Sequence, residues 1–303
     1  MVPSKLVRND RYRLRIGVVA FLAAFAALKL FVSHWDEDVS ILSRQAALDV
    51  QSYPQYVKKV AQEQTPKKAC PLEGTSKVPG TRIVVDKTGV RTQPRDRLEV
   101  LKQFTRVDYE TYMMEAPGRE HYTLWHWLTS TYHDCRHVTD IGTRFAASAL
   151  ALGASGLGVK TIDIPESKER LEAFRGKTEE EWQRQVREQG ATIEFVSKNL
   201  LEVSDSEFRD YLSTWLVVLD TFHKPYTVPF EREFLSRVVS MEPKFEGILI
   251  LDDIYHSKEM RQWWQEVQDN ADQWGYTAYD LTTIGHSSGT ALLDFSGKVV
   301  IRD

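Results

Sequence analysis

The chain has 303 residues, of which 42% are hydrophobic and 27% are charged, a composition typical of globular proteins with one large domain or two small ones. Its net charge of -4 excludes the overall basic character of nucleic-acid-binding domains, so we expect no nucleic-acid partner. The two cysteines, Cys70 and Cys135, exclude a disulfide framework but permit a single bridge.

The N-terminus has the pattern of a membrane anchor. Residues 1–15 carry five basic side chains and one acid, and residues 16–35 (IGVVAFLAAFAALKLFVSHW) are apolar apart from Lys29 and the polar end. About 20 apolar residues suffice for a helix to cross a bilayer, and positive charge before the span predicts a cytoplasmic N-terminus. We therefore predict a basic cytoplasmic tail, a single-pass transmembrane signal anchor, and a catalytic domain in the lumen (endoplasmic reticulum or Golgi in a eukaryote) or outside the cell.

Two other interpretations of residues 16–35 remain. A cleaved signal peptide needs a shorter apolar core and a cleavage site of small residues, which the following VSHWDED does not offer. A soluble amphipathic helix needs a polar face, whereas the apolar residues of this segment run all round. The membrane is therefore the predicted partner of the N-terminal helix.

The next part of the chain differs in composition from the rest. Residues 36–100 are polar and mixed, with several prolines and no long apolar run, so we assign them to a stem and a lead-in to the domain. A short strand is predicted at Thr81–Asp86. Residues 101–303 form the predicted domain, in which long stretches of helical pattern alternate with short apolar runs.

The short apolar runs predict a mostly parallel sheet. The first five runs are His137–Ile141, Val159–Ile164, Thr192–Val196, Trp215–Leu219 and Gly247–Leu251. Unbroken apolar strands between helical segments, such as 179–189 and 229–241, indicate a parallel sheet buried on both faces. Two further runs, Asp280–Gly285 and Thr290–Phe295, are separated by four residues and predict a terminal antiparallel hairpin. The expected fold is therefore an α/β domain with a seven-stranded sheet.

Acidic or amide side chains follow nearly every predicted parallel strand, at the sheet edge where α/β proteins bind ligands. They are Asp140, Asp163, Asn199, Asp220 and the pair Asp252–Asp253. After the first strand, Gly142 permits a positive φ or a close backbone approach to a ligand, and a helix of small residues with free N–H groups follows. Because only one glycine lies in residues 138–152, the G-x-G-x-x-G turn of dinucleotide sites is absent.

Two sets of acids have specific alternatives. Asp163 suits a ribose diol, because one carboxylate can accept from both hydroxyls, or it caps the helix that follows. Asp220 and the pair Asp252–Asp253 follow strands whose ends lie about 5 Å apart if they are neighbours. Such carboxylates repel one another, which a divalent cation such as Mg²⁺ relieves, although each acid alone is explained as well by a helix cap.

Three histidines lie near these strand ends. They are His223, His256 and His286, and each is a candidate general base or ligand. The competing interpretation for each one is an ordinary packed or solvated histidine.

Residues 101–303 resemble class I S-adenosylmethionine-dependent methyltransferases. In that family the first strand ends in an acid-x-Gly-x-x-x-Gly motif, which here spans residues 140–146 with Ala146 in place of the second glycine, adding a methyl group near the cofactor. The resemblance implies a Rossmann-like fold, S-adenosylmethionine as cofactor, and a seventh strand inserted beside the fifth. It also implies cofactor contacts from Glu120, Asp140, Gly142, Thr143, Ser148, Asp163 at the ribose and Asn199 near the adenine.

A narrower branch of methyltransferases, some encoded near glycan-biosynthesis genes, is similar in five segments. These are residues 118–128, 140–152, 219–223, 249–260 and 282–295. Metal-dependent O-methyltransferases of the wider family carry an Asp after strand four and Asp-Asn after strand five. The resemblance therefore implies O-methylation of a hydroxyl on a glycan or small molecule, with metal ligands Asp220, Asp252 and Asp253 and catalytic groups drawn from Asp220, His223, His256 and His286.

Three other functions compete with this one. An inactive Rossmann-like binding or scaffold protein keeps the fold without the chemistry, which the departure at Ala146 permits. A nicotinamide-dependent oxidoreductase is disfavoured by the missing G-x-G-x-x-G and by the terminal hairpin. A membrane glycosyltransferase shares the plan of anchor, stem and domain, but it usually carries an Asp-x-Asp metal motif, and the pair Asp252–Asp253 lacks the spacer.

Overall fold

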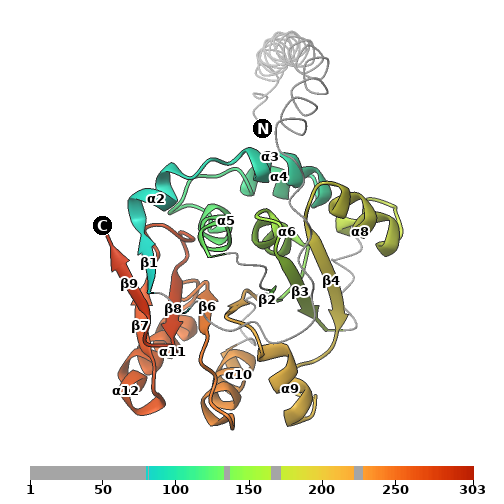
Figure 1. Ribbon diagram of the computed structural model, residues 1–303. Helices are drawn as coiled ribbons and strands as arrows, with labels where there is room; N and C mark the ends of the chain where they lie inside the picture. The colour runs from blue at the N-terminus through green and yellow to red at the C-terminus, as the bar shows by residue number, and fades with distance from the viewer. Residues whose placement is uncertain (1–79, 81, 133–136, 165–171, 222–227) are drawn as a thin grey trace, which may run out of the picture. The chain divides into compact units, whose positions relative to one another are not determined.

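The computed structural model describes residues 80, 82–132, 137–164, 172–221 and 228–303 (Figure 1). All of them belong to the second of the two units into which the chain divides, Gln64–Asp303. The predicted anchor at 16–35 and His223 lie outside the described residues. Within the described part of the chain, every helix is too short or too polar to span a bilayer.

A seven-stranded sheet lies at the centre of the described region. Its strand order is β4-β3-β2-β5-β6-β8-β7, and β8 alone runs antiparallel to its neighbours. The predicted mostly parallel sheet is confirmed, with its last strand inserted beside the fifth parallel strand. In chain order the strands are β2 (His137–Ile141), β3 (Gly158–Asp163), β4 (Thr192–Ser197), β5 (Leu216–Leu219), β6 (Ile248–Asp252), β7 (Thr277–Asp280) and β8 (Thr290–Asp294).

The terminal hairpin is confirmed, but the position predicted for its first strand is wrong. The predicted strand Asp280–Gly285 lies mostly in the connection between β7 and β8. Leu281 and Ile284 are fully buried there, so their side chains pack into the core from a turn and imitate the pattern of a strand. The true strand β7 is an edge strand with an exposed residue at each end, and it therefore lacks the apolar run of the buried strands.

A second, two-stranded sheet joins the two ends of the described region. The predicted strand at Thr81–Asp86 is confirmed over β1 (Ile83–Asp86), which pairs in parallel with the unpredicted strand β9 (Val299–Arg302). Ile83 of this sheet is buried in the same cluster as residues of two short helices, α2 (Lys87–Thr92) and α3 (Asp96–Leu101). The packed region therefore includes residues well before the expected domain start at residue 101.

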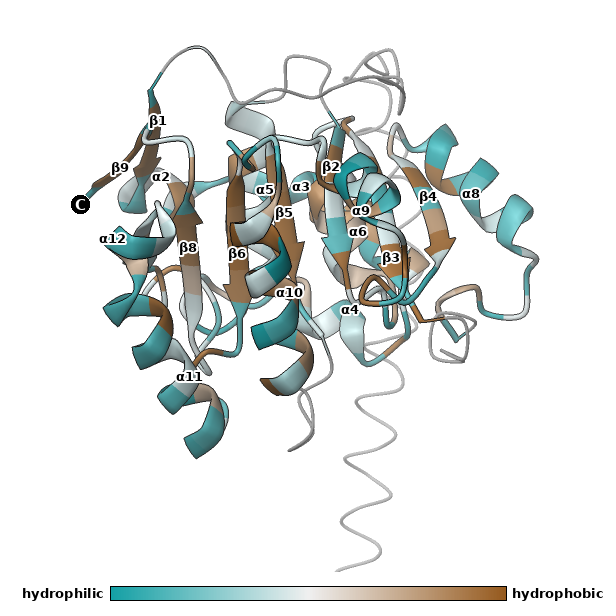
Figure 2. Ribbon diagram, turned by 90° about the horizontal axis from the view of Figure 1, so that it is seen from below, coloured by the Kyte–Doolittle hydropathy of each residue, from teal (hydrophilic) through white to brown (hydrophobic). Residues whose placement is uncertain are grey.

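Helices cover both faces of the seven-stranded sheet (Figure 1, Figure 2). One face carries α5 (Tyr122–Thr131), α6 (Ala147–Gly153) and α8 (Glu179–Glu188). The other carries α9 (Asp205–Leu212), α10 (Val228–Ser240) and α11 (Lys258–Asp269). The remaining short helices are η1 (Lys102–Phe104), α4 (Tyr109–Tyr112) and α12 (Ala271–Trp274).

Two hydrophobic clusters correspond to the two faces of this sheet. In β5, Val218 belongs to the cluster that contains Trp125 of α5, whereas the adjacent Val217 belongs to the cluster that contains Phe234 of α10. Successive strand residues point to opposite faces, so a strand covered on both sides must be apolar throughout. This is why β5 and β6 appear as brown runs in Figure 2 and as unbroken apolar runs in the sequence.

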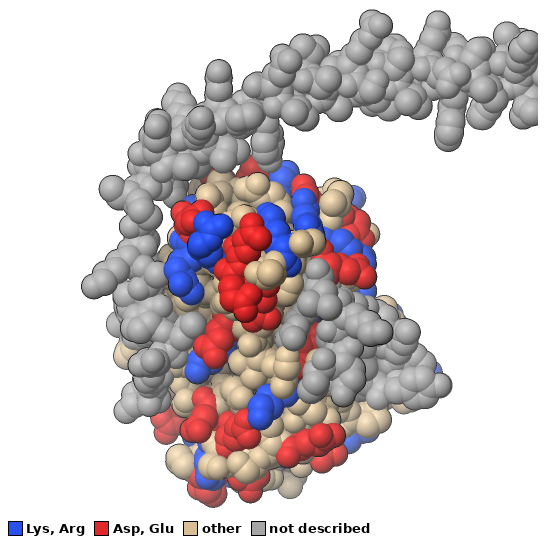
Figure 3. Space-filling view, turned by 90° about the vertical axis from the view of Figure 1, so that its right-hand side faces the viewer, with Lys and Arg blue, Asp and Glu red and all other residues tan. Residues whose placement is uncertain are grey.

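The surface carries charges of both signs. On the face shown in Figure 3, basic and acidic side chains are interspersed among uncharged ones. Ion pairs such as Arg184–Glu188 of α8, 2.7 Å apart, join neighbouring charges of opposite sign. This distribution is typical of a solvated protein surface.

Gly142 determines how closely the ends of β2 and β5 approach. Its φ is +103°, and a Cβ atom at this position would lie 1.9 Å from the backbone oxygen of Asp220. The backbone N–H of Gly142 donates to the oxygen of Ile162 at 2.9 Å, and that of Asp220 donates to Ile141 at 2.9 Å. The turn after β2 is therefore locked against both neighbouring strands.

We expect Gly142→Ala to lower the free energy of unfolding by about 3 kcal/mol or more, because it adds a backbone clash to a left-handed conformation. Gly297 offers the matched control, since its φ is +67° and no atom lies within 4 Å of an added Cβ. Gly297→Ala should cost only the conformational strain, about 1–2 kcal/mol. Chemical denaturation followed by circular dichroism measures the loss of unfolding free energy in each variant. Equal losses in the two variants would contradict the predicted backbone clash at Gly142.

Candidate functional site

A cavity of about 510 Å³ opens at the carboxyl ends of β2, β5 and β6. This is the edge at which an open α/β sheet binds its ligands. The turn after β2 forms one wall, and residues that follow β5 and β6 form another. The remaining lining comes from α4, from the start of α5, and from His286 in the connection between β7 and β8.

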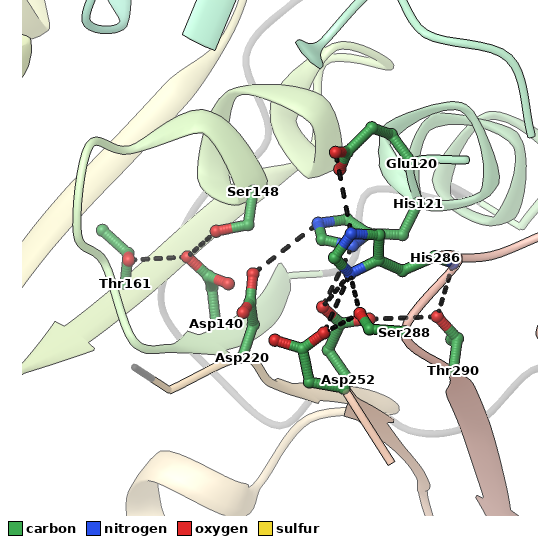
Figure 4. A network of polar contacts seen from close by, with 11 residues as sticks. Glu120, His121, Asp140, Ser148, Thr161, Asp220, Asp252, His286, Ser288 and Thr290 are labelled. Atoms are coloured by element: carbon green, nitrogen blue, oxygen red, sulfur yellow. Dashed lines mark hydrogen bonds and ion pairs between the residues drawn. The ribbon is translucent and has the colours of Figure 1, made fainter. Parts of the chain in front are cut away.

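Asp140 lies directly behind the first wall, at the end of β2. It is fully buried, and its Oδ2 accepts hydrogen bonds from Ser148 Oγ at 3.0 Å and Thr161 Oγ1 at 2.7 Å. Among the described residues, nothing donates to its Oδ1, and Figure 4 shows this carboxylate beside that of Asp220. Burial raises the pKa of Asp140 to about 7, against the opposing effect of the two hydroxyls. Ser148 itself lines the cavity.

Two residues of the turn other than glycine have positive φ values. They are 41° at Arg144 and 62° at Ala146. Ala146 is fully buried in the hydrophobic core and does not line the cavity. Contrary to expectation, the methyl group that distinguishes it from the glycine of the family motif packs in the core, so the substitution affects the conformation of the turn rather than the space for a ligand.

Asp163, at the end of β3, is hydrogen-bonded to the turn after β2. Its Oδ2 accepts from the backbone N–H of Arg144 at 3.2 Å, and its Oδ1 accepts from that of Ile164 at 2.8 Å. An ionised carboxylate has about four acceptor positions, so capacity for a ligand remains. Asp163 lies next to the cavity wall without lining the cavity itself.

The structure does not bring Asn199 to the cavity. Its side chain accepts from the backbone N–H of Leu201 at 3.1 Å and donates to Glu202 Oε1 at 2.7 Å. This is an Asx turn after β4, a common local use of asparagine. The polar residue at this strand end is therefore explained by turn formation.

A cluster of imidazoles and carboxylates forms the second wall (Figure 4). Its centre is Asp252, only 2% exposed, whose Oδ2 lies 3.2 Å from Nδ1 of both His121 and His286. The other oxygen of Asp252 accepts from Thr290 Oγ1 at 3.0 Å. On its far side, His121 places Nε2 3.6 Å from Oδ2 of Asp220. Imidazoles and carboxylates therefore alternate in this wall.

His286 connects Asp252 to a second group of polar residues. Its Nδ1 lies 3.0 Å from Oδ1 of Asp253, and its Nε2 lies 3.6 Å from Oε1 of Glu120. Ser288 Oγ donates to Asp253 and lies 2.8 Å from Nδ1 of His286. Asp253 has a φ of 59°, an uncommon conformation for a residue other than glycine.

Burial and mixed charge together set the electrostatics of the cluster. Burial lowers the pKa of His121, but the carboxylates of Asp252 and Asp220 outweigh it and raise this pKa to about 9. Burial likewise opposes a charge on His286, but Asp252 and Asp253 raise its pKa to about 11. Despite burial, the two imidazoles hold the pKa of Asp252 well below its usual range. Burial and the charge of Asp252 raise the pKa of Asp220 well above its usual range.

Most of the predicted site residues line this cavity, but not in the predicted arrangement. The members at the wall are Glu120, Gly142, Thr143, Ser148, Asp220, Asp252, Asp253, His256 and His286, of which His256 is exposed. Among the described residues, the three carboxylates expected to share a metal fall into two overlapping groups. Donor atoms of Asp220 and Asp252 lie within 4.8 Å of each other and of His121, whereas Asp253 groups with Asp252 and His286.

His121 is the residue that the sequence analysis missed. It lies within residues 118–128, one of the segments that resemble a methyltransferase branch, directly after Glu120. The available signal was an adjacent acid and histidine just before an apolar helix. That signal is weak by itself, because only the fold places the start of α5 against the ends of β5 and β6.

Comparison with known proteins finds similarity at the level of fold. No family model matches the chain, and no curated protein matches its sequence. The SAH-bound methyltransferase PaMTH1 of Podospora anserina is 12% identical, with 66% of this chain and 87% of that one covered and a TM-score of 0.41. A Klebsiella pneumoniae protein described as a candidate O-methyltransferase is 13% identical, with 68% and 93% covered and a TM-score of 0.39. An O-methyltransferase family protein of Burkholderia thailandensis is 16% identical, with 52% and 50% covered and a TM-score of 0.34.

The strand order agrees with the topology expected from the sequence. A parallel sheet whose last strand is inserted antiparallel beside the fifth is the topology implied by the resemblance to class I S-adenosylmethionine-dependent methyltransferases. The acid-x-Gly turn after the first strand of that core, at Asp140–Gly142, occupies the place that the family motif requires. In the second wall of this site, two histidines alternate with the carboxylates.

Asp140 makes the stability of the fold depend on pH. Its pKa of about 7 in the folded state lies above the ordinary value of 3.8, so the unfolded chain loses this proton at lower pH than the folded one. Its contribution to stability therefore falls as pH rises from about 4 to about 7 and stays reduced above that.

Asp140→Asn keeps an acceptor for Ser148 and Thr161 but has no proton to lose. We expect this variant to have a higher Tm than the unmodified chain at pH 8 and nearly the same Tm at pH 4. Thermal unfolding followed by circular dichroism at the two pH values measures the difference. A Tm difference that is independent of pH would show that Asp140 is not the group responsible.

Proposed function

We propose that the chain is an S-adenosylmethionine-dependent methyltransferase that methylates a hydroxyl group of a glycan or a small molecule. The observation that carries this proposal is the single cavity shared by the turn after β2 and the histidine–carboxylate cluster. These two walls differ in chemistry, as the binding of two different ligands requires. The methyl donor is assigned to the turn, and the acceptor is assigned to the cluster.

The residues around the turn fit a ligand with a positive charge. Asp140 has a buried oxygen to which no described residue donates, and burial raises the pKa of both Asp220 and Glu120. A cation bound beside such acids stabilises their ionised forms. S-adenosylmethionine, when bound, supplies a methyl group on a positively charged sulfonium. Asp163 has acceptor capacity left for the ribose hydroxyls.

His286 is the proposed general base. Asp252 and Asp253 lie beside its Nδ1 and orient the ring, while its side chain remains 22% exposed at the cavity. A base held by a buried carboxylate is the arrangement that directed proton transfer requires. The pKa of about 11 keeps the His286 ring protonated at neutral pH, so the ring must first give up its own proton. In the proposed reaction, Nε2 of the deprotonated ring then takes the proton that the acceptor hydroxyl loses when its oxygen is methylated, and methyl transfer is expected to become faster as pH rises. Asp220, also at the cavity wall, helps to position that hydroxyl.

The proposal includes assistance by a divalent ion and a membrane location. Support for the ion comes from Asp220 and Asp252, whose carboxylate oxygens lie within 4.8 Å of each other at the cavity wall. Support for the location comes from the apolar residues 16–35, which are proposed to anchor the chain with its catalytic domain on the luminal or extracellular side. Glycans are abundant in those compartments, which favours a glycan acceptor. The second candidate function is a scaffold protein that keeps the fold without catalysis.

Calorimetry with S-adenosylhomocysteine tests the class of ligand. We expect the full chain to bind it, and Asp163→Asn to weaken binding at least tenfold, because the amide has one acceptor oxygen where the carboxylate has two. Asp205→Asn is the matched control, since Asp205 is an exposed acid at the start of α9 and does not line the cavity. Binding of NADH in place of S-adenosylhomocysteine would favour the oxidoreductase, and binding of neither would favour the scaffold.

His286→Gln is expected to lower kcat at least about 100-fold, the usual contribution of a general base, while leaving the Kd for S-adenosylhomocysteine within threefold. The measurement is transfer of labelled methyl groups to an acceptor chosen from a panel of methyl glycosides and phenols. The same exchange at His256, exposed at the cavity rim, should lower kcat less than fivefold. A large loss at His256 with none at His286 would contradict the assignment of the base.

A further inference from the structure

His121 has two buried nitrogens without hydrogen-bond partners. The residue is only 3% exposed, and its Nδ1 and Nε2 lie 3.2 Å and 3.6 Å from oxygens of Asp252 and Asp220. Despite these short distances, neither contact has the geometry of a hydrogen bond. Buried polar atoms are nearly always partnered, so two in one ring indicate a ligand between the ring and its neighbours.

The three side chains are arranged as metal ligands are. One donor atom of each residue, His121, Asp220 and Asp252, lies within 4.8 Å of the others. Metal–ligand distances of about 2.0–2.2 Å place two donors of one ion roughly 3–4.4 Å apart, so small side-chain rotations suffice. The three donors come from the start of α5 and the ends of β5 and β6, and Asp220 keeps one side open to the cavity with 24% of its side chain exposed.

Asp253 belongs to a different group in spite of its place next to Asp252. Its carboxylate already accepts from Ser288 Oγ and lies 3.0 Å from Nδ1 of His286. An ion bound at Asp253 would have to displace these partners. The nitrogen atoms that lack hydrogen bonds are those of His121, which lies beside Asp252 and Asp220.

We propose that His121, Asp220 and Asp252 bind a divalent transition-metal ion, such as Mn²⁺, Co²⁺ or Zn²⁺, in preference to Mg²⁺. Imidazole nitrogen suits Zn²⁺ and ions like it, and the two carboxylates suit Mn²⁺, whereas Mg²⁺ prefers oxygen ligands and retains its water. Asp253 is excluded from this ligand set, which therefore differs from the three carboxylates expected from the sequence. The role of the ion, which is to orient the acceptor hydroxyl, rests on the proposed function. The binding of the ion to these three residues does not.

Titration of the full chain with Mn²⁺, followed by electron paramagnetic resonance without cofactor, tests this site. We expect one ion per chain, bound at least tenfold more tightly than Mg²⁺ in a competition titration. His121→Phe keeps a ring stacked on Trp125, where the centroids now lie 4.6 Å apart, but removes both nitrogens, so it should weaken Mn²⁺ at least tenfold. The Kd of each variant for Mn²⁺ is the quantity compared.

Two neighbouring acids provide a matched pair for the same titration. Asp252→Asn and Asp253→Asn remove the same charge from adjacent residues, and we expect the first to weaken Mn²⁺ at least tenfold and the second less than threefold. Equal losses in the pair, or full affinity in His121→Phe, would overturn the ligand set. Tight binding of Mg²⁺ at the level of Mn²⁺ would overturn the preference.

Spin-echo spectroscopy of Mn²⁺ bound to the unmodified chain tests directly whether a histidine nitrogen is a ligand. It therefore does not depend on any variant folding. Coupling to a ¹⁴N nucleus is expected from the His121 ligand in the unmodified chain, and an echo without nitrogen modulation would refute the proposal. Binding of S-adenosylhomocysteine without Mn²⁺ binding would reject this inference alone. The converse result, an ion site dependent on His121 without cofactor binding, would reject the proposed function alone.

Discussion

The site depends on the compensation of one buried charge, the carboxylate of Asp252. Its two oxygens face three partners that are distant in sequence: His121 at the start of α5, and His286 and Thr290 around the start of β8. A buried carboxylate without such partners would be strongly destabilising, so these elements must meet at the end of β6. The antiparallel insertion of β8 makes the meeting possible, because its register places Thr290 directly opposite Asp252.

The two walls of the cavity differ in how their buried carboxylates are compensated. Around Asp252 each carboxylate has an imidazole neighbour, and the charges balance locally. Around Asp140 the hydrogen bonds from described side chains come from two hydroxyls, and one oxygen has no donor among the described residues. The wall around Asp252 therefore pairs its carboxylates with imidazoles, and an ion bound there would replace such an imidazole–carboxylate contact. The other wall lacks positive charge, which a cationic ligand brings.

The sequence predicts what is local and periodic, and fails where distant segments meet. The unbroken run around Val217 identifies β5 because both faces of the sheet are covered, and Asp220 follows because parallel strands end at one edge. The pairing of β9 with β1 joins residues at opposite ends of the described region. A pattern within a short stretch of sequence therefore cannot predict this pairing. His121 was missed for the same reason: its role arises only when α5 packs beside two strand ends.

Several buried acids around the cavity argue that its composition is shaped by a ligand rather than by packing. Burial raises the pKa of Asp140 to about 7 and that of Glu231 in α10 to about 8, so both oppose the folded state at neutral pH. Amides or apolar residues of similar volume would fill the same space at lower cost. Acids with perturbed pKa values concentrate where binding or catalysis uses them. A positively charged ligand that binds only the folded chain offsets part of this cost, and it thereby couples occupation of the cavity to stability of the sheet edge on which the cavity is built.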